Sequence, residues 1–176
     1  MQRGGQAIVL IGFMGAGKSS VGQRLETGTG FSRFDTDEMI AAKFGLSVPR
    51  IFEMHGEDIF REAESEALHH LDPHEPSIVV TGGGIVLRTT NRELLQQLGT
   101  VVYLQADDET LFERISRRAS RPLLRTEDPY ATMKELLGRR LSLYEEIADL
   151  RIDTSRLNHD EVCDLILQNV TVPKRA

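Results

Sequence analysis

Short apolar runs alternate along the chain with longer stretches in which apolar residues recur at helical spacing. The runs predict strands at residues 7–11, 77–81 and 100–104, and two further segments, 31–36 and 151–154, are expected to be short strands. Runs that are apolar at every position are typical of strands buried on both faces of a sheet. The intervening stretches predict helices at residues 18–26, 37–44, 49–55, 57–71, 91–98, 130–148 and 159–169, with another ending near residue 119. This alternation predicts an α/β fold with a parallel sheet and helices on both faces.

Glycine and aspartate residues mark several of the expected helix ends. Gly28 and Gly30 should end the first helix, and Gly56 should break the helical stretch in which it lies. Asp107 or Asp108 should cap the helix that begins after the fourth strand, because a carboxylate can accept hydrogen bonds from the first backbone N–H groups of a helix.

Composition and charge narrow the class of protein. The 176 residues, 40% of them apolar, suffice for one domain with a hydrophobic core, here residues 1–176. A net charge of −6 without a long basic run argues against nucleic-acid or anionic-membrane partners. No run reaches the roughly 18 apolar residues of a membrane span, and none has the form of a signal peptide. One cysteine, Cys163, excludes an internal disulfide framework and a cysteine-rich zinc site. A cytoplasmic enzyme or switch protein is therefore expected.

The strongest chemical signal follows the first predicted strand. Residues 12–19 read GFMGAGKS, which matches G-x-x-x-x-G-K-S, and they open the first predicted helix, as a phosphate-binding loop requires. Glycines let the backbone approach an anion closely, and the helix N-terminus offers N–H groups to phosphate oxygens. Lys18 is expected to bridge the β- and γ-phosphates, and the Ser19 hydroxyl to bind Mg²⁺. The nucleotide contacts expected in this segment are Gly12, Gly15, Ala16, Gly17, Lys18, Ser19 and Ser20.

Two carboxylates, Asp35 and Asp37, follow the second predicted strand. Ligands of open parallel sheets bind at the carboxyl ends of the strands, and strand alternation would point both side chains the same way. One carboxylate could hold Mg²⁺, and the other could accept a hydroxyl proton. Two simpler roles stay open, namely a helix N-cap for Asp37 and a turn residue at Asp35. Asp107 and Asp108 compete for the metal role, although helix capping explains them more simply.

Several arginines and glycines are candidates for binding a second, anionic substrate. Arg61 and Glu64 lie three residues apart on one predicted helix. They could form an exposed ion pair, or Glu64 could orient Arg61 toward a carboxylate of the substrate. Gly82, Gly83 and Gly84 form either a simple turn or a floor at which a small ligand reaches backbone N–H groups. Arg139 and Arg140 are adjacent, and one of the two is expected to be a charged residue on the surface. The polar loop that carries Arg117, Arg118, Arg121 and Arg125 is either solvated or a mobile lid that closes over ATP.

Taken together, these motifs resemble the shikimate kinase family. The resemblance covers roughly residues 8–154, and its segments are GFMGAGKSSVG at 12–22, FDTD at 34–37, FREAE at 60–64, TGGG at 81–84, RPLL at 121–124 and RLSLY at 140–144. It implies a three-layer P-loop NTPase fold with a five-stranded parallel sheet, a substrate-binding region near residues 37–64 and a mobile lid near residues 117–130. It also implies transfer of the γ-phosphoryl group of ATP to the 3-hydroxyl of shikimate, with Mg²⁺ as cofactor, by a monomer.

The resemblance also implies roles for individual residues. Asp35 is the metal-associated carboxylate, and Asp37 binds the substrate hydroxyls and helps to activate the nucleophile. Arg61 and Arg140 bind the shikimate carboxylate, with Gly82, Gly83 and Gly84 as the backbone part of that pocket. Arg121 is the lid arginine on the ATP phosphates, and Arg156 lies in the region that lines adenine.

The chain departs from the family pattern at residues 26–33, at Ser142, where the family usually has proline, and at residues 1–5. Two other functions stay open at this point. One is a kinase of the same fold that acts on gluconate or a nucleoside monophosphate. The other is a nucleotide-dependent switch without turnover.

Overall fold

The computed structural model describes residues 4–117 and 126–171. Its strands are β1 (Ala7–Ile11), β2 (Ser32–Asp35), β3 (Ser77–Val80), β4 (Gly99–Gln105) and β5 (Leu150–Asp153). Its helices are α1 (Lys18–Thr29), α2 (Thr36–Phe44), α3 (Val48–His69), α4 (Thr89–Leu98), α5 (Asp108–Ser116), α6 (Pro129–Ile147) and α7 (His159–Asn169), with a 3₁₀ turn η1 (Ile85–Leu87).

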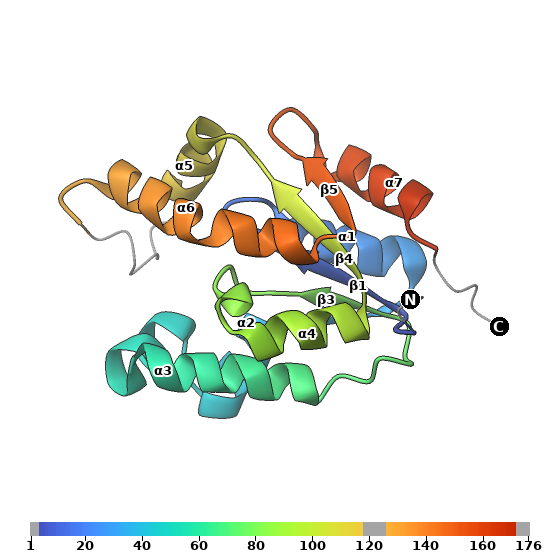
Figure 1. Cartoon of the computed structure of the whole chain (residues 1–176), viewed down its shortest axis with the longest axis horizontal. Helices are drawn as coiled ribbons and strands as arrows, with labels where there is room; N and C mark the ends of the chain where they lie inside the picture. The colour runs from blue at the N-terminus through green and yellow to red at the C-terminus, as the bar shows by residue number, and fades with distance from the viewer. Residues whose placement is uncertain (1–3, 118–125, 172–176) are drawn as a thin grey trace.

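The five strands form one parallel sheet in the order β2-β3-β1-β4-β5. The central strand β1 pairs in register with β3 on one side, Val9 opposite Val79, and with β4 on the other, Val9 opposite Val101. Figure 1 shows the helices on both sides of this sheet, with α1 and α7 together on one side and α4 and α6 on the other. The α/β fold with a five-stranded parallel sheet and helices on both faces is therefore confirmed.

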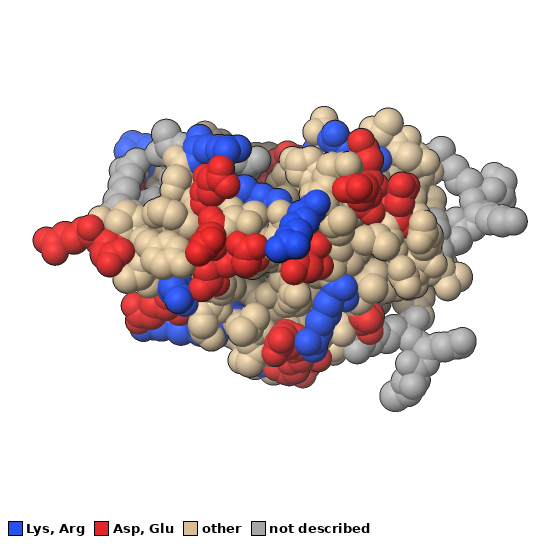
Figure 2. All heavy atoms as spheres, turned by 90° about the horizontal axis from the view of Figure 1, so that it is seen from above, with Lys and Arg blue, Asp and Glu red and all other residues tan. Residues whose placement is uncertain are grey.

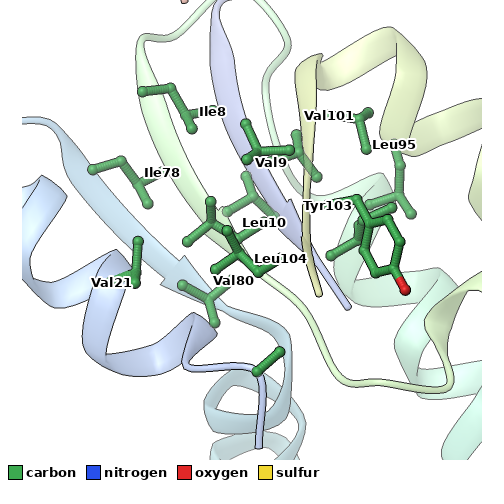
Figure 3. Packing of buried hydrophobic residues seen from close by; sticks show 14 of the residues in the cluster. Ile8, Val9, Leu10, Val21, Ile78, Val80, Leu95, Val101, Tyr103 and Leu104 are labelled. Carbon is green, nitrogen blue, oxygen red and sulfur yellow. The ribbon is translucent and has the colours of Figure 1, made fainter. Parts of the chain in front are cut away.

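The core follows from the alternation of side chains along the strands. Ile8 and Leu10 face the side of α1, where Val21 lies, and Val9 faces the side of α4, where Leu95 lies (Figure 3). All five residues of β1 are buried, as expected for a strand covered on both faces. Charged side chains stay outside this core, and Figure 2 shows acidic and basic groups interspersed on one face of the molecule.

Most predicted helix ends are confirmed, and three details differ, one of which is the end of α5, at Ser116 and not near residue 119. The first helix continues through Gly28 and ends at Gly30, whose φ of 71° makes it a left-handed C-cap. Gly56, with φ 81° and ψ 173°, breaks α3 as expected. The side chain of Asp107 caps α5 by accepting a hydrogen bond from the backbone N–H of Thr110. The turn η1, which follows the glycines after β3, was not predicted.

None of the helices within residues 4–117 and 126–171 is both long enough and apolar enough to cross a membrane. The proposed lid near residues 117–130 lies mostly outside the described part of the chain, which resumes shortly before α6.

Candidate active site

A cavity of about 510 Å³ opens at the carboxyl ends of β1, β2 and β3. Three segments of chain meet there: the glycine loop with the start of α1, the β2–α2 junction, and the glycines after β3. Residues 114 and 117 of the α5 region and residues 157–160 before and within α7 complete the wall. The expected nucleotide and hydroxyl sites thus share one cavity, because parallel strands end at the same edge of the sheet.

The glycine loop has the backbone geometry of an anion cradle. Gly12, Gly15 and Gly17 have φ values of 142°, 83° and 96°, in a region that side chains disfavour. A Cβ on Gly12 would also lie 2.2 Å from the carbonyl oxygen of Leu104. Lys18 begins α1, and its Nζ donates hydrogen bonds to the carbonyl oxygens of Gly12 at 2.7 Å and Phe13 at 2.9 Å. The lysine ammonium is therefore held against the loop that would receive the phosphates.

Arg114, which the sequence did not single out, fastens this loop to the end of β5. Its guanidinium donates to Thr154 O at 2.8 Å, to Thr154 Oγ1 at 3.0 Å and to Gly15 O at 3.4 Å, and it lines the cavity. Two further lining residues, Arg24 and Asp160, form an ion pair at 2.6 Å between α1 and α7. Contacts between segments so far apart in sequence follow from the packing of α7 on α1, and no local pattern indicates them.

The segment that was expected to lie near adenine lines the cavity only in part. Residues 157–160 line the cavity, including Asn158 and His159, whereas Arg156 is exposed and is not among the lining residues. The ring of His159 approaches the glycine loop, since its Nε2 would lie 3.6 Å from a Cβ on Gly17. Arg121 lies outside the described residues.

Asp35 and Asp37 both line the cavity, but not for the reason given by strand alternation. The strand ends at Asp35, and Asp37 lies in the first turn of α2. Asp35 is the N-cap: its Oδ1 accepts from the backbone N–H of Asp37 at 3.0 Å and of Glu38 at 3.4 Å. The alternative that made Asp37 the cap is wrong. Burial, and then the negative charge of Asp37, raise the pKa of Asp35.

Arg33 of β2 limits this accumulation of negative charge. Its guanidinium lies 3.7 Å from Asp35 Oδ2 and also pairs with Glu26 at 3.3 Å and Glu38 at 3.1 Å. Arg33 is part of the segment in which the chain departs from the family pattern.

Arg61 and Glu64 form a buried ion pair, so the alternative of an exposed pair is wrong. Their side chains are 9% and 0% exposed, and Arg61 Nη1 donates to Glu64 Oε2 at 2.7 Å. Arg61 also donates to Glu57 Oε1 at 2.9 Å. Burial raises the pKa of Glu64 to about 7, despite the opposing effect of Arg61, and the negative charge of Asp37 adds to the rise.

The three glycines after β3 connect the carboxylates with the arginines. A Cβ on Gly82 would lie 2.7 Å from Asp37 Oδ1 and 2.9 Å from Glu64 Oε1, and one on Gly84 would lie 2.3 Å from Arg61 Nη1. These positions exclude side chains because charged groups already occupy the space. The N–H of Gly82 donates to Thr36 Oγ1 at 3.2 Å, so this donor serves the fold.

Arg140 approaches the same turn from α6. Its side chain is buried, its guanidinium carbon lies 5.7 Å from the centre of the Phe13 ring, and its Nη1 would lie 3.7 Å from a Cβ on Gly83. The Tyr144 hydroxyl, one helical turn later, donates to Gly83 O. Arg139 is exposed and pairs with Glu135, as expected for one of the two neighbouring arginines.

The fold and the glycine loop together define a P-loop nucleotide-binding protein. A family model described as shikimate kinase matches residues 14–171 of this chain. The chain therefore belongs to the shikimate kinase family, whose members are ATP-dependent kinases.

Curated relatives and solved structures agree with this assignment. The chain is 42% identical to a shikimate kinase from Thermodesulfovibrio yellowstonii over 161 residues, and this match covers 92% of each chain. It is 45% identical to a shikimate kinase from Bordetella pertussis over 150 residues, and this match covers 85% of this chain and 71% of the relative. A structure of shikimate kinase from Acinetobacter baumannii in complex with shikimate matches with a TM-score of 0.88 at 38% identity, and covers 94% of this chain and 93% of that one. A gluconokinase from Sinorhizobium meliloti shares only the fold, at 18% identity and a TM-score of 0.55.

Proposed function

We propose that this chain transfers the γ-phosphoryl group of ATP to the 3-hydroxyl of shikimate, giving shikimate 3-phosphate and ADP on the route to chorismate and the aromatic amino acids. One observation carries the proposal. The phosphate loop and the two buried arginines, Arg61 and Arg140, all approach the Gly82–Gly84 turn, and Asp37 approaches the same turn at Gly82. The chemistry needs this arrangement, because phosphoryl transfer requires little of a protein beyond alignment of the reacting groups and neutralisation of charge.

At the nucleotide end, the glycine loop would surround the phosphates with backbone N–H groups, and Lys18 would move from its own loop carbonyls to the β- and γ-phosphates. The segments that would face the base and ribose are Arg114 and residues 157–160, since they line the same cavity beyond the loop. Arg121 would approach the phosphates from the proposed lid, residues 117–130.

Mg²⁺ fits the residues present. Ser19 offers a hydroxyl and Asp35 a carboxylate, both on the cavity wall, and no group of three metal-ligating side chains lies together within residues 4–117 and 126–171. Mg²⁺ prefers oxygen ligands and keeps several waters, so phosphate and water oxygens would complete such a site. When bound, the ion neutralises charge on the phosphates. Asp35 would act directly or through water, and its orientation is already fixed by the cap of α2.

At the acceptor end, Asp37 would accept a hydrogen bond from the substrate hydroxyl and help to remove its proton as the oxygen attacks phosphorus. Arg61 and Arg140, which reach the glycine turn from α3 and α6, would bind the carboxylate of the ring acid. Glu64 is a positioning residue, because its ion pair with Arg61 fixes the guanidinium beside Gly84.

We also propose that the chain acts as a single-domain monomer in the cytoplasm, where ATP and Mg²⁺ are available. One chain supplies both parts of the described site, which supports a monomer. The net charge of −6 supports small-molecule substrates over nucleic acid or an anionic membrane.

A coupled assay of ADP release tests the proposal. We expect ADP production to depend on shikimate, with no comparable turnover on gluconate or a nucleoside monophosphate. Asp37→Asn should lower kcat by at least about a hundredfold with nearly unchanged ATP affinity, as is typical for loss of a general base. Asp58→Asn, an exposed change on α3, is the control. Turnover by Asp37→Asn within a few-fold of the parent, or ATP binding without shikimate-stimulated ADP release, would contradict the proposal.

A further inference from the structure

Glu64 is buried beside the glycine turn that follows β3, and only one of its two carboxylate oxygens has a partner. The side chain is 0% exposed, and Oε2 accepts a hydrogen bond from Arg61 Nη1 at 2.7 Å. The other oxygen, Oε1, is buried and has no hydrogen-bond partner among residues 4–117 and 126–171. A buried, charged oxygen without a donor is costly, and a proton bound to it would remove that charge.

A proton on Oε1 would have an acceptor close by, because Asp37 approaches the same point. A Cβ on Gly82 would lie 2.9 Å from Glu64 Oε1 and 2.7 Å from Asp37 Oδ1, so the two oxygens crowd the same space beside this glycine. Carboxylates this close disfavour two negative charges and favour one shared proton. Asp37 lines the cavity and is half-buried, whereas Glu64 is fully buried, so the charge is more costly on Glu64.

Charged groups from three helices surround Glu64. Arg61 belongs to α3, Asp37 to α2 and Arg140 to α6, and all three act on the Glu64 carboxyl, whose pKa burial raises to about 7. Tyr144 of α6 stays neutral, because burial raises the pKa of its hydroxyl above the ordinary value. The empty pocket therefore sets two guanidinium groups against two carboxyl groups.

Two further charged groups lie around this cluster. Glu57 contacts Arg61 at 2.9 Å, but its side chain is 51% exposed. Arg88, just before α4, donates to the Ser65 hydroxyl at 3.4 Å. Both are present with and without substrate, so neither alters the effect of the charge that a substrate brings.

We propose that Glu64 takes up a proton when shikimate binds. The substrate adds a third carboxylate to the two guanidinium groups of Arg61 and Arg140, and one proton restores the balance of charge. The proton comes from solvent and bonds to Glu64 Oε1, and the new O–H donates a hydrogen bond to Asp37 Oδ1. Oε2 continues to accept from Arg61, whose charge then serves the substrate. Proton uptake of this kind rests on the proposed function, in which the two arginines bind the shikimate carboxylate.

Glu64 is then a positioning residue for the base as well as for the arginine. Its O–H orients Asp37, which keeps its own charge for the proton of the substrate hydroxyl. The affinity for shikimate follows from the same linkage. Well below pH 7 the empty site already holds the proton, so the affinity is highest there and nearly constant. Above pH 7 binding must draw the proton from solvent, so the affinity falls until the bound site releases it too.

Calorimetric titration of shikimate into the protein saturated with Mg²⁺ and ADP tests the proposal. Titrations at about pH 7.5 in two buffers of different ionisation enthalpy give the number of protons taken up. We expect about half a proton per shikimate, as for a group whose affinity for protons rises about tenfold on binding. Between about pH 6 and pH 9 the affinity for shikimate should fall about tenfold.

Glu64→Gln keeps an acceptor for Arg61 but cannot bind the proton. It should take up no proton with shikimate, and its affinity should stay within about twofold over the same pH range. Glu57→Gln is the matched control, because it removes a carboxylate from the same guanidinium at an exposed position. It should keep both the proton uptake and the fall in affinity.

Shikimate binding by the wild-type protein without proton uptake would overturn the proposal and leave the proposed function intact. This measurement needs no variant, so it decides the matter even if Glu64→Gln does not fold. Undiminished uptake in Glu64→Gln, or loss of uptake in Glu57→Gln as well, would show that the proton binds elsewhere. Absence of shikimate binding would contradict the proposed function itself, which shikimate-dependent ADP release measures separately.

Discussion

The Glu64→Gln variant should become more stable than the wild-type protein as the pH rises, although the change removes one partner of a buried ion pair. The carboxyl is 0% exposed, and its pKa in the folded protein is about 7, against an ordinary value of 4.5. The folded protein therefore holds a proton that the unfolded chain releases between pH 4.5 and 7. Across that window the wild-type protein should lose about 1.4 kcal/mol of stability per pH unit relative to Glu64→Gln, about 3 kcal/mol in all.

Urea unfolding of both proteins at intervals from about pH 4 to 8.5 measures this difference directly. Below pH 4.5 both side chains are neutral, so the two stabilities should nearly coincide; above pH 7 the difference should level off. Glu57→Gln is the control, since Glu57 contacts the same guanidinium at 2.9 Å but its side chain is 51% exposed. That change should alter stability by less than about 1 kcal/mol. A difference between wild type and Glu64→Gln that is constant over the whole range would show that burial does not hold a proton on Glu64.

Three further substitutions test the acceptor pocket and the backbone. Arg61→Lys should raise the KM for shikimate about tenfold or more in steady-state assays and leave the KM for ATP unchanged, because an ammonium cannot reproduce a two-point grip on a carboxylate; equal affinity would remove Arg61 from that role. Gly84→Ala would place a Cβ 2.3 Å from Arg61 Nη1, and since the guanidinium must then shift from its buried pair with Glu64, we expect a higher KM for shikimate and a lower melting temperature; an unchanged KM would contradict the proposed closeness. Gly56→Ala should cost about 1–3 kcal/mol in urea unfolding, because φ 81° with ψ 173° suits only glycine. Gly28→Ala, in open space near the end of α1, serves as control for both, and stability equal to the parent in Gly56→Ala would refute the strain.

The sequence was sufficient wherever geometry is local. A phosphate loop is a continuous stretch whose glycines and first helical turn determine its shape, so residues 12–19 could be predicted as a unit. The same holds for the break at Gly56 and for the cap at Asp107. Spacing placed Arg61 and Glu64 on one helix face but left their burial open, because burial depends on what packs against that face. Similarly, the spacing could not show which of the adjacent arginines is buried, because Arg139 and Arg140 differ only in the direction in which their side chains leave α6.

Contacts between distant segments could not be predicted from any pattern in the chain. Arg114 reaches Gly15 and Thr154, residues that meet only after β5 joins the sheet beside β4. The correction at Asp35 has a similar cause. Alternation assumed that the strand continues to residue 37, whereas α2 begins at Thr36, and the carboxylate of Asp35 satisfies the first N–H groups of that helix. Both carboxylates still line the cavity, because α2 begins at the cavity wall and Asp35 and Asp37 lie at its N-cap and in its first turn.

The two parts of the proposed site share one wall, which would link acceptor binding to the shape of the phosphate loop. A Cβ on Gly83 would lie 3.4 Å from the backbone nitrogen of Met14 and 3.7 Å from Arg140 Nη1, so one glycine separates loop and arginine. Its carbonyl accepts a hydrogen bond from the buried hydroxyl of Tyr144, which fixes the turn against α6. A shikimate carboxylate that draws Arg140 inward would therefore act on the same turn that borders the ATP phosphates. Positioning of both substrates would then depend on a backbone segment of three glycines, which has no side chains to rearrange.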